Sequence, residues 1–210
     1  MTVAASDDGV RPLIEELDSA GKFPAECLAL LHTVPRELFI PARMWVQEVG
    51  DGPYEPVDRA DDSQRWMRAV YSNRVIVTQF DDGATVWPDV GDRPTCSASM
   101  PSAVLGMLAE LDVRQGHSVL EIGTGTGWNA ALLATLVGAQ GNVDTVEIDT
   151  VMAADARTRL DEAGFGNVHA HVADGAADTV SGEFDRVIAT AGVHIGQLPR
   201  SWVAHTRPGV

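Results

Sequence analysis

The chain has 210 residues, of which 45% are hydrophobic and 21% charged. This length and balance are typical of one globular domain with at most a small additional layer. The formal net charge of −15 disfavours a nucleic-acid partner, because phosphate binding depends on clustered lysine and arginine. No apolar run approaches the roughly 18 residues that indicate a membrane span, so no membrane contact is expected.

The first residues and the cysteines indicate a compartment. The segment MTVAASDDGVRP lacks the basic and apolar regions of a secretory signal. The two cysteines, Cys27 and Cys96, form no metal-ligand cluster, and we expect both to be reduced thiols. The sequence therefore predicts a cytoplasmic protein without a metal site, and it leaves the oligomeric state open.

Residues 1–95 form the first predicted region. The pattern is helical from Pro12 to Gln47, in two pieces separated by Gly21 and Pro24. Residues 50–95 contain several prolines and one candidate strand at 74–80, which favours a substrate-facing lid over a packed layer. Two smaller expectations concern this region, namely a turn at Asp81-Asp82 and three tryptophans that pack an additional layer: Trp45, Trp66 and Trp87.

Residues 96–210 alternate between helical and strand patterns, which indicates an α/β fold of the doubly wound, Rossmann-like class. Such alternation predicts a mostly parallel sheet with helices on both faces and with ligands at the carboxyl ends of its strands. Glycines follow two of the predicted helices, where they favour helix termination. The predicted helices span 101–112, 128–138 and 150–164, and the predicted strands span 117–123, 142–148, 167–173 and 184–191.

The segment from Val119 to Ala134, VLEIGTGTGWNAALLA, is the most informative stretch of the chain. A short apolar run ends in an acid, breaks into three glycines at alternate positions and continues into a helical pattern. Glycines permit a sharp turn and leave no side chain between the backbone and a ligand. A strand, glycine loop and helix in this order predict a cradle for a nucleotide or a related cofactor.

Residues around the loop discriminate between cofactors. Trp128 stands where a dinucleotide fingerprint has its third glycine, and no P-loop lysine follows, so NAD and nucleoside triphosphates are disfavoured. Glu147 ends the next strand, where an acid reaches ribose hydroxyls. Glu121 lies beside the loop, where a negative charge favours a sulfonium or ammonium group over a pyrophosphate. Adenosine with a small charged tail fits best.

The motifs EIGTGTGWNAALLA, TVEID, VADG and FDRVIATA, in this order, resemble those of Rossmann-like S-adenosylmethionine-dependent methyltransferases. The flanking segments VPRELFIP, TCSASMPSAVLGML and FDRVIATAG are similar to protein-L-isoaspartate O-methyltransferases. This resemblance runs from about Leu28 to Gly209 with a gap at residues 50–90. It implies an enzyme that methylates an isoaspartyl or aspartyl carboxylate in a protein or peptide and so promotes succinimide formation.

The resemblance also implies roles for single residues. Ser97 would hold the substrate carboxylate beside the transferred methyl group, with Thr190 and Ala191 bordering the same cavity. The positions implied for S-adenosylmethionine fall into three groups: the methionine end at Glu121, Gly123, Thr124, Gly125 and Gly127, the ribose and adenine at Glu147 and Ile148, and the adenine edge at Asp174 and Gly175.

Simpler structural roles are open for several of these residues. Ser97 and Ser99 precede a predicted helix, so either serine could cap it, and capping is the expectation for Ser99. Asp174 could cap a turn, and His194 is expected to be a solvated loop residue. The cations available for a substrate carboxylate are Arg68, Arg74 and Arg93, and the sequence does not choose among them.

The chain departs from the family pattern on the substrate side. Ser99-Met100 replaces the usual Pro-His, Ala191-Gly192 opens a segment that is normally alanines and a proline, and the stretch between Val77 and Thr95 is longer. These departures leave a second hypothesis, a methyltransferase for aspartate in a dedicated natural-product peptide. A third is a non-catalytic cofactor-binding partner subunit. The final strand pair of the fold is expected to be missing after Arg207, as in a truncated chain.

The expected chemistry needs few groups. A carboxylate is ionised at neutral pH and is its own nucleophile, so the reaction requires no general base. Nucleic-acid methylation is the weakest alternative, because the acidic charge opposes it and the Asn/Asp-Pro-Pro-aromatic motif of amino-group methyltransferases is absent.

Overall fold

The computed structural model describes residues 7–50, 52–177, 180–193 and 196–208. The chain divides into two compact units, an amino-terminal unit up to Ala109 and a carboxyl-terminal unit from Glu110 onward. His194 and the last two residues lie outside the described residues. The functional division into residues 1–95 and 96–210 stays a prediction.

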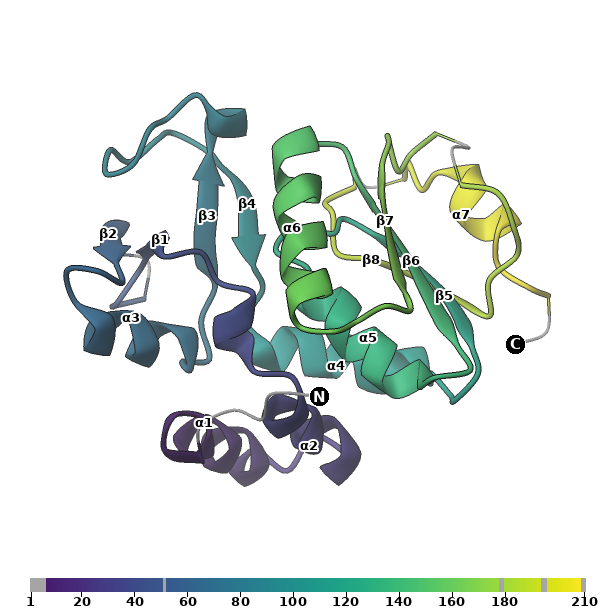
Figure 1. The fold of residues 1–210 in the computed structure, drawn as a ribbon, viewed down its shortest axis with the longest axis horizontal. Helices are drawn as coiled ribbons and strands as arrows, with labels where there is room; N and C mark the ends of the chain where they lie inside the picture. Colours follow the sequence, from purple (N-terminus) through teal and green to yellow (C-terminus); the bar gives the residue numbers. More distant parts are fainter. Residues whose placement is uncertain (1–6, 51, 178–179, 194–195, 209–210) are drawn as a thin grey trace. The chain divides into compact units, whose positions relative to one another are not determined.

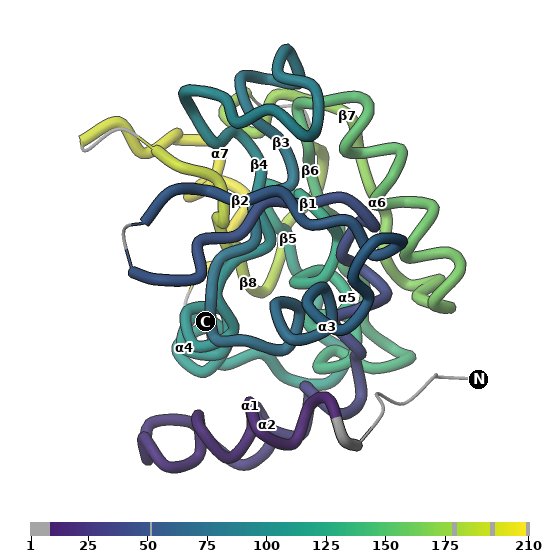
Figure 2. Tube along the Cα trace, turned by 90° about the vertical axis from the view of Figure 1, so that its left-hand side faces the viewer, coloured from purple at the N-terminus to yellow at the C-terminus, as the bar shows by residue number. Residues whose placement is uncertain are grey.

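The amino-terminal unit contains a four-stranded antiparallel sheet in the order β2-β1-β3-β4. Helices α1 and α2 precede it and lie side by side (Figures 1 and 2). The elements are α1 (Asp7–Ser19), α2 (Ala25–Thr33), the 3-10 helix η1 (Arg36–Leu38), β1 (Arg43–Val46), β2 (Glu55–Asp58), α3 (Ser63–Val70), β3 (Ile76–Phe80), the 3-10 helix η2 (Asp81–Gly83) and β4 (Pro94–Ala98), followed by α4 (Pro101–Leu111).

Two predictions for this unit are wrong. The helical pattern does not continue to Gln47, because the second helix ends at Thr33 and residues 43–46 form β1. Residues 50–95 are not irregular, since they supply β2, α3, β3 and the first two residues of β4 to a packed layer, and their substrate-facing role stays a prediction. The predicted strand at 74–80 is confirmed as β3, and the predicted turn at Asp81-Asp82 is confirmed as η2.

Aromatic side chains fill the core of the antiparallel sheet. Trp45, Val77 and Phe80 form a buried cluster, against which Tyr54 and Trp87 pack. The rings of Trp45 and Tyr54 each meet Phe80 edge to face, with centroids 5.2 Å apart, a favourable arrangement for aromatic pairs. The expectation that the tryptophans pack a layer is therefore confirmed.

The carboxyl-terminal unit contains a four-stranded parallel sheet in the order β7-β6-β5-β8 (Figure 1). The predicted strands and helices are all confirmed to within a few residues. Helix α7 was not predicted. The elements are β5 (Ser118–Ile122), α5 (Trp128–Val137), β6 (Asn142–Glu147), α6 (Thr150–Glu162), β7 (Val168–Val172), β8 (Arg186–Ala189) and α7 (Arg200–Ala204).

Alternation along β5 assigns helices to both faces of this sheet. Glu121 accepts a hydrogen bond from Asn129 of α5, whereas Leu120 and Ile122 pack in a cluster with Trp202 of α7. Successive strand side chains point to opposite faces, so α5 and α7 cover different faces. The predicted α/β architecture is confirmed.

Two further features concern the described residues. No described helix is long and apolar enough to cross a membrane. Cys27 is buried and Cys96 half-buried, and neither forms a disulfide bond.

Candidate active site

The loop between β5 and α5 depends on left-handed glycine conformations. Gly123, Gly125 and Gly127 have φ angles of 96°, 53° and 90°, which other residues adopt only with strain. A Cβ atom at Gly123 would lie 2.9 Å from the backbone nitrogen of Ala191 and 3.0 Å from Thr190 Oγ1. The loop therefore requires glycine there for space as well as for conformation.

Glu121 lies beneath this loop with none of its surface exposed. Its carboxylate accepts hydrogen bonds from Asn129 Nδ2 and Thr145 Oγ1, both at 2.6 Å. Thr145 Oγ1 in turn lies 2.7 Å from Thr124 Oγ1, so the network reaches the loop itself. Burial raises the pKa of Glu121 to about 7 against the opposing effect of the two hydrogen bonds, and the nearby charge of Glu147 raises it further.

Glu147, at the end of β6, meets the loop from the neighbouring strand. Its carboxylate accepts hydrogen bonds from the backbone N–H of Gly125 at 2.9 Å and of Asp149 at 3.2 Å. Ile148, the next residue, exposes 70% of its surface. The end of β6 thus presents an oriented carboxylate and an exposed aliphatic side chain next to each other.

Thr190 follows β8, on the other side of β5 from β6. Its Oγ1 donates to the carbonyl of Gly123 at 2.6 Å, and its backbone N–H and that of Ala191 donate to the carbonyl of Ile122. In open parallel sheets, ligands bind where neighbouring strands connect in opposite directions. The carboxyl ends of β5 and β8 form this position here.

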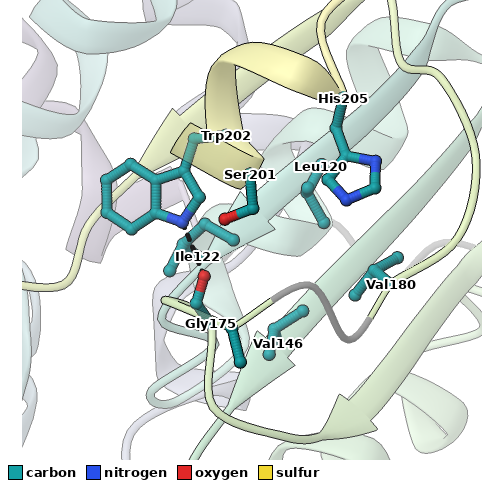
Figure 3. A pocket seen from close by; sticks show the side chains of 9 residues that line it. Leu120, Ile122, Val146, Gly175, Val180, Ser201, Trp202 and His205 are labelled. Atoms are coloured by element: carbon teal, nitrogen blue, oxygen red, sulfur yellow. Dashed lines mark hydrogen bonds between the residues drawn. The ribbon is translucent and has the colours of Figure 1, made fainter. Parts of the chain in front are cut away.

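Asp174 and Gly175 follow β7. Asp174 Oδ1 accepts a hydrogen bond from the backbone N–H of Ala176 at 2.9 Å, which forms a tight turn. A Cβ atom at Gly175 would lie 2.6 Å from Ile122 Cγ2, and the carbonyl of Gly175 accepts a hydrogen bond from Trp202 Nε1 at 2.6 Å (Figure 3). The turn-capping interaction considered for Asp174 is therefore present.

Trp202 closes the sheet beside this turn. Figure 3 shows its indole beside Ile122, with His205 just after the end of α7 and Val146 beside Gly175. The cavity between them has a volume of about 10 Å³, close to the minimum for one water molecule. This cavity is too small for an organic ligand, so it is part of the packing rather than a binding site.

Ser97 lies on β4 of the amino-terminal unit, where it pairs with Val77 of β3. The first turn of α4 is capped by neither Ser97 nor Ser99 among the described residues, because Asn73 Oδ1 accepts the hydrogen bond from the backbone N–H of Ser102 at 2.9 Å. The capping role expected for Ser99 is therefore carried by a residue that is distant in sequence.

Arg36 holds the segment that follows Ser97. Its guanidinium is almost entirely buried and donates hydrogen bonds to backbone carbonyls in two segments, residues 70–74 and residues 98–99. The shortest, at 2.8 Å, reach Val70 and Ser99. Burial lowers the pKa of Arg36 to about 9, so the side chain remains protonated at neutral pH.

The carboxyl-terminal unit thus brings together predicted cofactor residues at the ends of β5 and β6 and the predicted substrate-site residue Thr190 after β8. Sequence reasoning missed Asn129 and Thr145, which bind Glu121, and Arg36, which binds the segment after Ser97. Asn129 and Thr145 are polar residues among apolar neighbours, a pattern that the sequence itself shows. No described group of three or more His, Cys, Asp or Glu side chains is arranged to hold a metal.

Comparisons with known proteins agree with this geometry. Among curated relatives, the chain is 48% identical over 86 residues to a protein-L-isoaspartate O-methyltransferase of Methanocella arvoryzae, covering 41% of this chain and 45% of that protein. It is 39% identical over 128 residues to one of Rhodopseudomonas palustris, covering 60% and 57%. The chain spans about half the length of the curated relatives it matches.

Two solved structures share the fold. A protein-L-isoaspartate O-methyltransferase has a TM-score of 0.69 at 24% identity, covering 95% of this chain and 52% of that one. A related protein from Plasmodium falciparum, solved with S-adenosyl-L-homocysteine, has a TM-score of 0.66 at 13% identity, covering 94% and 79%. Residues 55–209 match the sequence profile of one family. The chain belongs to the protein-L-isoaspartate(D-aspartate) O-methyltransferase (PCMT) family.

Proposed function

We propose that this protein is an S-adenosylmethionine-dependent carboxyl O-methyltransferase that esterifies an isoaspartyl or aspartyl side chain in a protein or peptide. The observation that carries the proposal is the glycine loop of a PCMT-family chain, with Glu121 buried beneath it and Glu147 bound to its edge. Its product, an aspartyl methyl ester, is open to attack by the following backbone nitrogen, which gives a succinimide and releases methanol.

The residues present fit the cofactor. Gly123, Gly125 and Gly127 put no side chain on the loop, so the backbone of the loop can approach a ligand closely. Glu147 is oriented by two backbone N–H groups and keeps further lone pairs for ribose hydroxyls. The exposed Ile148 offers an apolar face for adenine. When bound, S-adenosylmethionine supplies a methyl group on a positively charged sulfur.

Glu121 suits a cationic ligand near the loop. At its pKa of about 7, the protonated and ionised forms of Glu121 are about equally populated at neutral pH, because burial outweighs the two hydrogen bonds. A positive charge nearby favours the ionised carboxylate, so binding of a sulfonium would lower this pKa. Glu121 would thereby contribute attraction through the loop, and Asn129 and Thr145 would keep its carboxylate fixed.

Ser97 is the residue proposed to hold the substrate carboxylate. The carboxylate is already ionised and is its own nucleophile, so the protein needs a donor that orients it rather than a base. A serine hydroxyl provides one donor. The strand pairing of Ser97 with Val77 and the hydrogen bonds from Arg36 to Ala98 and Ser99 support this role by fixing the backbone at Ser97 and at the two residues after it.

A second candidate keeps the chemistry and changes the target to an aspartate in a dedicated peptide. The loop between β3 and β4 favours it, because this loop is longer than the family pattern and is internally ordered. The Asp81 carboxylate accepts hydrogen bonds from Thr85 Oγ1 and from the backbone N–H groups of Asp92 and Arg93. An ordered additional loop provides a recognition surface for one particular peptide.

Methyl-ester formation tests the proposal. The protein is incubated with labelled S-adenosylmethionine and two matched peptides, one with isoaspartate and one with aspartate, and base-labile methyl ester is counted. Label in the isoaspartyl peptide alone supports action on damaged proteins. Cofactor binding without label in either peptide contradicts that reading, and it directs the search to a dedicated peptide or to a non-catalytic partner role.

The variant Ser97→Ala tests the proposed substrate contact. We expect turnover to fall by about tenfold or more, the value of one lost hydrogen bond to a charged group, while the dissociation constant of the cofactor stays within about twofold. The matched control is Ser99→Ala, which removes a hydroxyl two residues away and should leave turnover unchanged. Equal losses of turnover and cofactor affinity in Ser97→Ala would show that Ser97 does not contact the substrate.

A further inference from the structure

A cavity in the amino-terminal unit is lined by none of the residues proposed to bind the cofactor or the methylated carboxylate. It has a volume of about 250 Å³ and lies between α3, the end of β1 and the start of β3. Its walls include three arginines, Arg65, Arg68 and Arg74, and one acid, Glu48. In the whole chain, acidic residues outnumber lysines and arginines by 30 to 15. Three guanidinium groups around one cavity are therefore a local reversal of the overall charge.

The three arginines are not equivalent. Arg65 is neutralised, since it forms ion pairs with Glu48 at 2.6 Å and with Glu55 at 2.5 Å. Arg74 donates from Nη1 to the backbone carbonyl of Gln47 at 3.1 Å, a neutral partner that orients the guanidinium without cancelling its charge. Arg68 is exposed on α3. Within the described residues, neither Arg68 nor Arg74 has a carboxylate partner.

Unpaired arginines in one cavity favour an anionic ligand of matching shape. The guanidinium presents donors in a planar fork that fits a carboxylate with two parallel hydrogen bonds. Both arginines are exposed and line the same cavity, so an anion bound there would be attracted by two positive charges. Because the whole chain is acidic, its long-range field repels anions, and binding depends on this local pair.

The remaining walls of the cavity are mostly apolar, with the polar residues Gln47 and Ser72 among them. Val46, Ala69 and Ile76 contribute to them, and the exposed Val75 lies at the side of Arg74. An inorganic anion makes no use of such walls, whereas the aliphatic part of an acidic side chain or of its neighbour in a peptide can pack against them. The combination of aliphatic walls and two free guanidinium groups is suited to an acidic peptide segment.

We propose that this cavity is a binding site for a side-chain carboxylate of an acidic peptide segment, held by Arg68 and Arg74. The inference rests on the proposed function in so far as it takes the peptide to be the substrate of the methyltransferase. The site would bind a part of the peptide other than the carboxylate that is methylated. It selects Arg68 and Arg74 from the three cations that the sequence left open. Arg93, the third, is paired with Asp82 at 3.0 Å.

Calorimetric titration with two matched peptides tests the site directly. One is an acetylated, amidated peptide of alternating leucine and glutamate, and the other carries glutamine at every glutamate position. We expect the acidic peptide to bind and the neutral one not to. Arg68→Gln and Arg74→Gln should each weaken binding by about tenfold or more, the value of one hydrogen bond between charged groups. Arg93→Gln removes the same charge from the same unit and should leave the affinity unchanged.

Each outcome decides the proposal. Equal affinity for the neutral peptide, or no effect of Arg68→Gln and Arg74→Gln in variants with unchanged thermal unfolding, overturns the site. Glutarate that binds as tightly as the acidic peptide overturns the peptide as ligand in favour of a small acid. The methyl-ester assay tests the proposed function independently of this site. Peptide binding without ester formation contradicts the proposed function alone. Ester formation without binding of the acidic peptide contradicts this inference alone.

Discussion

Of the described residues, each compact unit buries one charged side chain, and the two are held in different ways. In the carboxyl-terminal unit, the carboxylate of Glu121 is bound by the side chains of Asn129 and Thr145. In the amino-terminal unit, the guanidinium of Arg36 is bound by backbone carbonyls of two segments. The Glu121 carboxylate is bound by side chains. The Arg36 guanidinium instead takes the place of backbone N–H groups as the donor to these carbonyls.

The difference follows from the two sheets. In the parallel sheet, backbone groups pair along the strands, so a buried side chain needs partners of its own. In the antiparallel unit, the turn at residues 70–74 and the end of β4 leave carbonyls that the sheet does not use, and Arg36 satisfies them. A buried charge is therefore a component of the site in one unit and a support for loops in the other.

Replacing the two buried charges tests this comparison, and we expect the largest effect at Arg36. The variant Arg36→Leu leaves the carbonyls of Val70 and Ala98 buried without their donor, at a cost of about 1–3 kcal/mol each. The free energy of unfolding, measured by urea denaturation, should fall by about 2–6 kcal/mol. Arg36→Lys should restore only part of it, since an ammonium lacks the planar fork that spans both segments.

The exposed Arg93 is the matched control for Arg36. It pairs with Asp82 and its side chain is 71% exposed, and exposed pairs contribute about 1 kcal/mol or less. Arg93→Leu should therefore change the free energy of unfolding by less than about 1 kcal/mol. A loss at Arg36 no larger than the loss at Arg93 would contradict the loop-supporting role.

The same contrast explains how far the sequence predicts the fold. Strands β5 and β8 contain short apolar runs, β6 alternates apolar and polar residues, and the helices after β5 and β6 end near glycines. Strand β2 reads as EPVD, with a proline and two acids, and gave no strand signal. Strand β1 follows a helical pattern, and its pairing with β3 depends on residues far apart in sequence.

The candidate site divides in the same way. The glycine loop, Glu121 and Glu147 stand at strand ends, so a sequence pattern locates them, and the structure brings them into one hydrogen-bonded group. The contacts of Arg36 join it to residues 34 to 63 positions away. No local pattern encodes such contacts, because they arise only when two loops meet. Helix α3 is an exception among the missed elements, since its cap, Asp62, precedes Ser63 as a readable signal.

The pH dependence of the free energy of unfolding tests the role of Glu121. Its expected effect lies between those of Arg36→Leu and of the helix-cap variants. Folding raises the pKa of Glu121 from 4.5 to about 7. Between these values the folded state holds a proton that the unfolded state has lost, so the free energy of unfolding falls as pH rises through this range. The shift corresponds to about 3 kcal/mol, present below the lower value and lost above the upper one.

The variant Glu121→Gln isolates this contribution. Glutamine keeps an oxygen acceptor for Asn129 and does not ionise, so its stability should lack the fall. Urea denaturation between about pH 5 and about pH 8 should show the difference between wild type and variant growing in favour of the variant. If the free energies of unfolding of wild type and variant change in parallel with pH, Glu121 does not titrate in this range. That result would contradict the description of Glu121 as a buried group whose pKa is raised by burial.

The smallest expected effects concern helix caps. The capping residue is adjacent to its helix in one unit and distant in sequence in the other. In the carboxyl-terminal unit, Asp149 caps its own helix, because its Oδ1 accepts from the backbone N–H groups of Val151 and Met152. In the amino-terminal unit, Asn73 accepts from the N–H of Ser102, 29 residues away. Asp149→Ala and Asn73→Ala should each lower the free energy of unfolding by about 1 kcal/mol, measured by urea denaturation.

A second substitution at each position distinguishes local from distant capping. Asp149→Asn keeps a side-chain oxygen within reach of the same helix, so it should retain nearly full stability, as caps of this type are interchangeable. Asn73→Asp keeps the acceptor oxygen for Ser102 and should likewise restore stability, although its geometry depends on the turn that Arg36 holds.

In an Arg36→Leu background, the loss of stability from Asn73→Ala should therefore shrink, whereas the loss from Asp149→Ala should persist, because contacts that share a support are not additive. Equal losses in both backgrounds would show that the loop at residues 70–74 keeps its shape without Arg36.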